Sequence, residues 1–426
     1  MPTGAIIRSA NVLRRSETLR HIGILFSGKA AMQLVALLSQ PVLARLYSPA
    51  QFGEFAFLNS LLAILMVAAS GRYESGIILT SRKQHAQHLF QLSQLFLLAY
   101  LVLISLLLLF VPGSILSNLG HQPLSPLYLW LIPLLVICAG YWEIVYNWLV
   151  RFQKYSSIST ALLIQRLLMI GGAVAAVILP VPGNGLIFGL ILSSIGIFVV
   201  ALLLKQEPLQ FPLRGIKAYS YSFREFPFFS VPSLYLLLII QHLPVLWFSH
   251  FFSTEITGAF SMAYLLVMLG CSSLMMSAGQ VYHQQFAQSK APEQLILLRK
   301  YLLAFLFLLA PFTVLLYIWG TPVLTWLLGS EWQQAGKIAS MLAPLGLFQG
   351  ISSILTIPLS VYRKQSVLLF LQVLKFVILL MALGAGYYWQ DVFLAFDLMS
   401  LGFLLHLLIV VAVVYPILNS RLKQQA

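Results

Sequence analysis

The chain contains about twelve apolar segments, and several of them have basic residues well inside. A run of roughly 20 apolar residues is long enough to cross the hydrocarbon core of a bilayer, which is about 30 Å thick. Lys29, Arg166 and Lys375 each lie within such a run. A charge at that depth is costly unless it faces the interior of the protein or water. We therefore expect a membrane protein with a basic interior, suited to the passage of an anionic compound.

The composition supports this interpretation. Of the 426 residues, 60% are hydrophobic and 8% are charged, whereas a soluble domain has about 25% charged residues. Lys and Arg together number 25 and Asp and Glu 11, which leaves a formal net charge of +14. In a soluble protein this excess of bases would suggest a nucleic-acid partner. In a membrane protein it is explained by the bases of the cytoplasmic loops, which set the orientation of the chain in the membrane. No nucleic-acid partner is expected.

Hydropathy predicts twelve membrane spans. They are residues 22–44, 55–71, 89–111, 127–149, 157–179, 185–204, 227–250, 257–280, 300–321, 336–361, 366–388 and 393–417. The first span is longer than the apolar core of a signal peptide and contains Lys29, Gln33 and Gln40, so we expect it to be retained. The expected fold class is an all-α polytopic membrane protein with two six-helix lobes around a central cavity.

A segment rich in proline and bases separates the two sets of six spans. We expect this segment, residues 205–226, to be a cytoplasmic linker between an N-lobe of residues 22–204 and a C-lobe of residues 227–417. The terminal segments, residues 1–21 and 418–426, are expected on the same side. Basic residues in short loops stay in the cytoplasm. With both termini cytoplasmic, the inner segments hold nineteen bases and the outer loops hold two, Arg45 and Lys337.

The two halves of the chain also share short patterns. Ser48, Gly53 and Phe55 follow the first span, and Ser253, Gly258 and Phe260 follow the seventh at a constant offset of 205. Farther along, Lys154 and Ser156 correspond to Lys364 and Ser366 at an offset of 210. Internal repeats are common in secondary transporters, whose substrate site lies between the repeats. The pattern predicts two parallel repeats related by an axis along the membrane normal.

Two stretches resemble a known family. Residues 41–55, PVLARLYSPAQFGEF, resemble the loop after the first helix of bacterial polysaccharide-biosynthesis flippases, and residues 71–79, GRYESGIIL, resemble the end of their second helix. These flippases belong to the superfamily that also contains multidrug extruders and lipid II flippases. The twelve-helix layout extends the resemblance over essentially the whole chain, whereas its sharp part is limited to residues 41–79.

The resemblance implies movement of an undecaprenyl-diphosphate-linked oligosaccharide from the cytoplasmic to the periplasmic leaflet of the bacterial inner membrane. Such transport serves the assembly of O-antigen, capsule or exopolysaccharide. The expected partners are the lipid-diphosphate-linked oligosaccharide, membrane lipids, polysaccharide polymerase and chain-length regulator proteins. No enzymatic activity, cofactor or metal is expected, because the sequence has neither a phosphate-binding loop nor a metal-ligand spacing.

Helical spacing groups the polar residues inside the spans into candidate cavity linings. The candidate substrate-binding residues are Lys29, Gln33, Arg72, Glu143, Asn147, Arg166 and Lys375. Arginine can hold a diphosphate through paired hydrogen bonds, and lysine can hold it as a point charge. Arg166 and Lys375 lie 209 positions apart, so each half would offer one cation at nearly the same depth.

A structural role is the alternative for each of these residues. Glu143 could pair with Arg166, and Asp397 with Lys375, because ions within membranes commonly pair. Arg72 and Glu74 could anchor the end of the second span at the membrane surface. The candidate gate or coupling residues are Arg45, Glu54, Glu74 and Asp397. The outer loops 45–54 and 252–260 are expected to flank the periplasmic mouth.

Two other functions remain open on the sequence alone. A small-molecule antiporter of the same superfamily would favour an acidic cavity for cationic drugs, whereas the first span here carries Lys29. A membrane glycosyltransferase acting on lipid-linked glycan would usually have a large periplasmic loop, which the predicted spans do not leave room for. The leading hypothesis is a flippase that works by alternating access.

Overall fold

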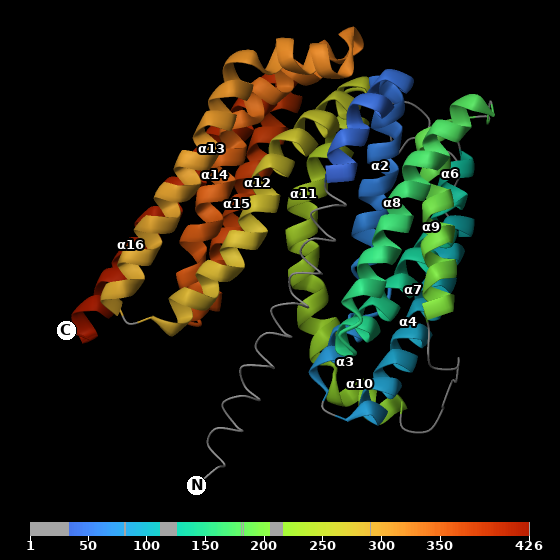
Figure 1. Ribbon diagram of the computed structural model, residues 1–426, viewed down its shortest axis with the longest axis horizontal. Helices are drawn as coiled ribbons and strands as arrows, with labels where there is room; N and C mark the ends of the chain where they lie inside the picture. The colour runs from blue at the N-terminus through green and yellow to red at the C-terminus, as the bar shows by residue number, and fades with distance from the viewer. Residues whose placement is uncertain are drawn as a thin grey trace, which may run out of the picture. The chain divides into compact units, whose positions relative to one another are not determined.

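The structure is a computed structural model that describes residues 34–80, 82–110, 126–179, 181, 183–204, 216–289 and 291–425. These residues form helices and connecting turns, and they include no strand (Figure 1). The first half contains the helix Leu34–Leu46, α2 (Pro49–Met66), α3 (Glu74–Leu79), α4 (Lys83–Phe110), α6 (Pro126–Trp130), α7 (Ile132–Arg151), α8 (Tyr155–Ile178) and α9 (Gly185–Leu204).

The second half begins with the short helix α10 (Ile216–Ser222) and a π-helical turn η1 (Phe226–Ser230). It continues with α11 (Val231–Phe251), α12 (Thr254–Gln288), α13 (Ala291–Leu328), the 3-10 turn η2 (Ser330–Trp332), α14 (Gln333–Val361), α15 (Gln365–Tyr388) and α16 (Val392–Gln425). Each of the twelve predicted spans overlaps one of these helices. The prediction of an all-α fold is therefore confirmed.

Many of these helices have the length and apolarity needed to cross a membrane. Within the described residues, ten helical segments meet both requirements, and two further apolar helices, Leu34–Leu46 and Thr254–Met268, are shorter. Large apolar side chains are exposed along them; Phe307, for example, is 84% exposed and Leu203 78%. Such surfaces suit contact with lipid tails, because an apolar area of this kind would be unstable in water.

The chain divides into two compact units. The first unit contains the end of α2 from Leu61, α3, α4 and α6–α10. Within it, α8 and α9 pack side by side, and α7 packs against α9 and α4. Gly172 and Gly189 lie at the contact of α8 with α9, where a Cβ on Gly172 would be 3.0 Å from the Gly189 Cα. Small residues allow this close approach of two membrane helices.

The second unit contains the start of α2, residues 47–60, together with most of α11 and all of α12–α16. Helix α14 lies at its centre and packs against α12, α13 and α16. A buried apolar cluster joins these helices, with Tyr282 and Phe286 from α12, Phe305 from α13 and Leu359 from α14. The predicted lobe boundaries, residues 22–204, 205–226 and 227–417, stay predictions.

The second span begins earlier and ends earlier than its predicted bounds of 55–71. Ser48 caps α2, because its hydroxyl accepts a hydrogen bond from the Gln51 N–H while the Gln51 Oε1 accepts one from the Ser48 N–H. This reciprocal arrangement stabilises a helix start. The helix ends at Met66, and Gly71 and Arg72 both adopt a φ of 61°, in the left-handed region. Two left-handed residues in succession break the helix before α3 begins.

The turns in the two halves repeat one another. Lys154 donates its N–H to the Leu149 carbonyl, and Lys364 donates its N–H to the Leu359 carbonyl. The residues before these lysines, Gln153 and Arg363, both have a φ of 55°. Each turn is therefore a left-handed helix end of the same type. Helices α8 and α15, which follow the two turns, have 24 residues each.

Candidate functional site

Two of the candidate cavity residues, Lys29 and Gln33, lie outside the described residues. The other candidates, apart from Arg45 and Glu54, fall into three separate places. Arg72, Glu74, Glu143 and Asn147 lie in the first unit around the break between α2 and α3, and Arg166 lies on α8 of the same unit. Lys375 and Asp397 lie in the second unit, on α15 and α16.

The break between α2 and α3 holds a buried ion pair. The Arg72 Nη1 lies 3.4 Å from the Glu74 Oε1, and the Ser70 hydroxyl donates a 2.5 Å hydrogen bond to the Glu74 Oε2. The Glu74 side chain is 1% exposed and the Arg72 side chain 29%. A carboxylate buried this deeply needs both partners to offset its lost hydration. Glu74 is thus a buried partner of Arg72, and the expectation of a surface anchor is wrong for it.

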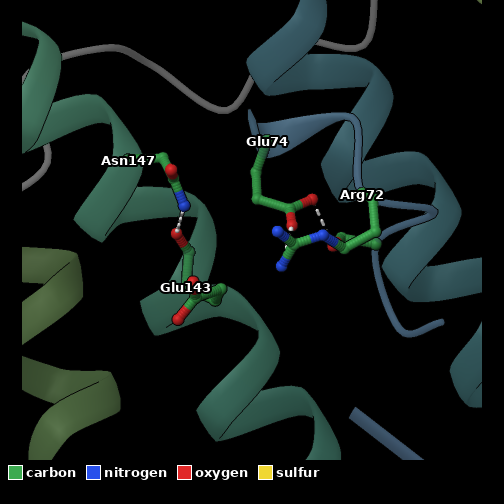
Figure 2. Close-up of polar contacts among 5 residues, drawn as sticks. Arg72, Glu74, Glu143 and Asn147 are labelled. Atoms are coloured by element: carbon green, nitrogen blue, oxygen red, sulfur yellow. Dashed lines mark hydrogen bonds and ion pairs between the residues drawn. The ribbon is translucent and has the colours of Figure 1, made fainter. Parts of the chain in front are cut away.

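The face of α7 that is turned toward this break carries two other polar candidates, Glu143 and Asn147. Figure 2 shows Arg72 and Glu74 on one side and Glu143 and Asn147 on the adjacent helix. The Asn147 Nδ2 donates a 2.8 Å hydrogen bond to the Glu143 carbonyl oxygen. The Glu143 carboxylate interacts electrostatically with both Glu74 and Arg72. One basic side chain, Arg72, therefore shares this cluster with the acidic residues Glu74 and Glu143, and substrate binding by Arg72 stays a prediction.

Arg151, at the end of α7, holds the end of α3 in place. Its Nη1 donates hydrogen bonds to the Ile77 carbonyl at 2.8 Å, to the Thr80 hydroxyl at 3.1 Å and to the Thr80 carbonyl. The last carbonyls of a helix lack partners within the helix, and a cation satisfies them well. Arg151 thereby ties the short helix after the break to α7, which also carries Glu143.

Arg166 occupies the middle of α8 and is half-buried. Its Nε is buried and has no hydrogen-bond partner among the described residues. No ion pair between Arg166 and Glu143 occurs in the described part of the chain. The alternative in which these two residues neutralise each other is therefore wrong, and Arg166 keeps a donor that no described residue satisfies.

Lys375 is 7% exposed and lies among α14, α15 and α16. Its amine donates a 2.6 Å hydrogen bond to the Gln349 Oε1 and lies 4.9 Å from the centroid of the Phe403 ring. Asp397 is exposed, and within the described ranges no ion pair joins it to Lys375. The amide and the aromatic face hold the amine without cancelling its charge. Pairing with Asp397 is therefore wrong as an explanation of this buried lysine.

Arg166 and Lys375 occupy nearly equivalent positions along α8 and α15, but they differ by one residue in register. The turns before α8 and α15 are related by an offset of 210, and the two cations by an offset of 209. A difference of one residue shifts a side chain along the helix by about 1.5 Å and rotates it by about 100°. The position equivalent to Lys375 in the first half is Gln165. The two cations are not symmetry mates.

The sequence interpretation did not identify the partners of the buried charges. Ser70, Gln349 and Phe403 contact Glu74 or Lys375, and none of them was a candidate. Gln349 carried a usable signal, because it is an isolated amide in a long apolar span. Its pairing with Lys375 depends on how α14 packs against α15, which periodicity does not reveal.

The candidate gate segments lie close to one another at the start of α2 and α12, within the second unit. A Cβ on Gly53 would meet the Thr254 carbonyl oxygen, and a Cβ on Gly258 would meet the Pro49 carbonyl oxygen. Ser253 caps α12 by accepting a 3.1 Å hydrogen bond from the Ile256 N–H, as Ser48 caps α2. The shared serine and glycine thus have the same structural roles in both halves.

Arg45 and Glu54 flank the first of these segments. Arg45 is exposed at the end of the helix Leu34–Leu46, and Glu54 is half-buried in α2. Both make polar or electrostatic contacts. Near them, Phe52 packs edge-on against Trp332, with ring centroids 5.0 Å apart. Within the described residues, no group of three or more His, Cys, Asp or Glu side chains is arranged to hold a metal ion.

Comparison with known families identifies one match. The family described as polysaccharide biosynthesis protein matches residues 42–337, which is more than half of the chain. No curated protein sequence matches the chain.

Several solved structures share the fold. The lipid II flippase MurJ in an inward closed conformation has a TM-score of 0.67 and 16% identity, covering 92% of this chain and 87% of its own. An inward-facing multidrug resistance MATE family transporter of the MOP superfamily has a TM-score of 0.69 and 12% identity, covering 92% and 96%. A MOP superfamily transporter from Pyrococcus furiosus has a TM-score of 0.56 and 13% identity, covering 94% and 95%. At these identities the likeness establishes the fold, a multi-pass membrane transporter fold with about twelve helices.

Proposed function

The chain belongs to the polysaccharide biosynthesis protein family, and on that premise we propose that it moves an undecaprenyl-diphosphate-linked oligosaccharide from the cytoplasmic to the periplasmic leaflet. The family match and the transporter fold of the similar structures support a role as a flippase or exporter. The substrate and the direction are our proposal. The lobes are residues 22–204 and 227–417, the linker is 205–226, and both termini face the cytoplasm of a bacterium.

The observation that carries the proposal is a pair of intramembrane cations without acidic partners. Lys375 bonds only neutral groups among the described residues, and the Arg166 Nε bonds none of them. A diphosphate leaving water loses its hydration, and a fixed cation replaces that stabilisation. At 4 Å the attraction between unit charges rises from about 1 kcal/mol in water to about 4 kcal/mol at the effective dielectric constant near a protein surface. A cationic interior thus favours an anionic cargo.

The cluster of Arg72, Glu74 and Glu143 in the first unit has a different role in the proposed function. Arg72 is already neutralised by Glu74, with Glu143 nearby, so this cluster adds no positive charge for the cargo. We assign Arg72 and Glu74 to the stability of the helix break, and Glu143 and Asn147 to the polar lining of the path. Lys29 and Gln33 remain proposed lining residues from the sequence.

A small-molecule antiporter is the second candidate, because a MATE family transporter shares the fold. The Pyrococcus furiosus transporter is described as having a binding pocket of reversed polarity that suggests a different function. The polarity of the interior is therefore the property that separates the two candidates. The basic residues of this chain favour the anionic lipid-linked cargo.

The test uses purified protein in proteoliposomes that contain a fluorescent lipid-linked oligosaccharide. A membrane-impermeant quencher reports which leaflet holds the glycan. We expect the wild type to redistribute the glycan, and Arg166→Gln and Lys375→Met to slow this redistribution at equal protein content. Arg299→Gln is the matched control, since it removes one exposed base from α13.

Three results would contradict the proposal. The first is a wild-type protein that leaves the glycan distribution unchanged but exports drugs in an efflux assay. This result would favour the antiporter. The second is a change in the mass of the glycan, which would indicate a glycosyltransferase. The third is equal activity of the wild type and the two cation variants, which would remove the role of the buried charges.

A further inference from the structure

The segment from α10 to η1, residues 216–230, has one face that is fixed to the first unit. The Tyr219 ring stacks on His88 of α4, with centroids 4.6 Å apart, and lies 5.7 Å from His85. The Ser220 Oγ lies 3.1 Å from the Tyr73 hydroxyl, within hydrogen-bond distance. Figure 1 shows α10 beside α3 and the start of α4. The segment is therefore anchored by side chains of α4 and by Tyr73, which directly precedes α3.

The aromatic residues that follow continue the same contact. Phe223 and Phe226 stack with ring centroids 6.1 Å apart. Both rings lie beside α3, because a Cβ on Gly76 would be 3.5 Å from an atom of each. These contacts hold the π-helical turn against the short helix after the break, so the orientation of the segment's other face is defined.

The opposite face exposes large aromatic side chains next to a base. Tyr221 is 68% exposed, Phe228 71% and Phe229 72%. Arg224 is also exposed, and its guanidinium carbon lies 4.4 Å from the centroid of the Tyr221 ring. Three largely exposed aromatic side chains in so short a segment are unfavourable in water. An arginine stacked on a tyrosine keeps all of its hydrogen-bond donors available to an anion.

This face lies where two apolar helical segments begin. The apolar segment Phe226–Phe251 begins at η1, and α4 begins at Lys83, beside which Arg82 is also exposed. Glu225, next to Arg224 in the chain, is also exposed. Aromatic and basic residues at the ends of membrane helices match the level of lipid headgroups. Acidic lipids attract such bases by about 1 kcal/mol for each Lys or Arg near the surface.

We propose that this face is a binding site for an anionic phospholipid. Arg224, stacked on Tyr221, holds the phosphate of the headgroup, and Phe228 and Phe229 insert at the boundary of the acyl chains. The charge at this end selects acidic over zwitterionic lipids. This lipid is a structural partner of the first unit and is distinct from the transported cargo, so the proposal holds whether or not the chain moves an oligosaccharide.

Native mass spectrometry of the full chain, with equimolar phosphatidylglycerol and phosphatidylcholine, tests the proposal. We expect the wild type to retain phosphatidylglycerol preferentially. Arg224→Gln should weaken its retention about fivefold, as expected for the loss of one base, whereas Arg224→Lys should keep most of it. Arg299→Gln removes an exposed base from α13, which belongs to the second unit, and should leave this retention unchanged.

A photoreactive residue at Phe229 provides a second readout that does not depend on removing Arg224. Crosslinking to lipid in membranes would support the site. Crosslinking to protein, whether a second copy of the chain or another protein, would overturn it. Equal retention of the two lipids by the wild type, or equal loss in Arg224→Gln and Arg299→Gln, would also overturn it.

Discussion

Gly53 and Gly258, which are 205 residues apart, contact each other's helices reciprocally. A Cβ on Gly53 would meet the Thr254 carbonyl oxygen of α12, and a Cβ on Gly258 would meet the Pro49 carbonyl oxygen of α2. Both contacts lie in the first two turns after a serine cap, so the starts of α2 and α12 touch backbone to backbone. Glycine is required here by the close approach, since any side chain would occupy the place of the facing carbonyl.

Replacing either glycine by alanine is expected to separate the two helix starts. The inserted methyl group must displace backbone atoms, and overpacking of this kind typically costs about 1–3 kcal/mol. Thermal unfolding of Gly53→Ala and Gly258→Ala in detergent measures this cost. We expect both variants to unfold at lower temperature than the wild type.

Alanine at other helical glycines serves as the control. Nothing lies within 4 Å of a Cβ on Gly171 of α8 or on Gly384 of α15. Gly171→Ala and Gly384→Ala should be neutral or slightly stabilising, because alanine favours the helix by about 1 kcal/mol over glycine. Equal effects at all four positions would show that helix propensity, and not the crossing, explains the result.

The contact between the starts of α2 and α12 is also expected to open during transport. Cysteines at Ser48 and Ser253, in a background without Cys138 and Cys271, allow a bifunctional thiol reagent to report the separation of the two caps. Rigid-body rocking should make the crosslinking yield depend on substrate or on membrane energisation. Ser48→Ala and Ser253→Ala control for the lost caps, each worth about 1 kcal/mol. A yield that stays constant under all conditions argues against a moving gate.

For surface-glycan production, the positive charge at position 166 is expected to matter more than the shape of the side chain. Arg166→Ala should impair surface-glycan production strongly, and Arg166→Lys should retain more function, because the charge supplies most of the attraction for the diphosphate. The same order is expected at Lys375 for Ala and Arg. Surface glycan measured at equal membrane abundance tests both positions. Normal export by the alanine variants would exclude the cations from the transport path.

The ion pair at the helix break predicts a specific order of stabilities. Arg72→Ala and Arg72→Gly both leave Glu74 buried with Ser70 as its remaining partner, so both should be less stable than the wild type. Arg72 has a φ of 61°, which glycine adopts without strain. Arg72→Gly should therefore be more stable than Arg72→Ala by about 1–2 kcal/mol.

A second left-handed residue separates the backbone effect from the ion pair. Gln153, exposed in the turn after α7, has a φ of 55°. Gln153→Gly should be more stable than Gln153→Ala by a similar amount, and neither should disturb a buried charge. If glycine and alanine are equivalent at both positions in thermal unfolding, the left-handed conformation does not contribute to stability.

Much of the fold was predictable because apolar length is a local property. Each of the twelve predicted spans overlaps a helix, although the second span runs from Pro49 to Met66 instead of 55–71. The early start follows from the Ser48 and Gln51 cap, which is readable in the sequence. The early end follows from left-handed backbone at Gly71 and Arg72. Left-handed geometry at an arginine has no local sequence signal, so the break was not predicted.

The candidate site was predictable in its residue types and not in its pairings. The sequence singled out Lys375 as a charge within an apolar span, and suggested Asp397 as its alternative partner. The structure places Gln349 and Phe403 around the amine and leaves Asp397 exposed. Likewise, Arg166 and Lys375 occupy nearly equivalent positions along α8 and α15 but differ by one residue in register. Register is set by packing.

The sequence by itself determined that the chain is a helical membrane protein that resembles the polysaccharide biosynthesis family and has bases inside its apolar spans. Hydrophobic length, the excess of bases and two short motifs carry that information, and each depends on neighbouring residues alone. Only the tertiary structure decided that Glu74 is buried with Arg72 and Ser70, and that Gly53 and Gly258 meet across a helix crossing. Those contacts join helix faces distant in sequence or depend on backbone turns, and their energies arise only when the helices pack and exclude water or lipid.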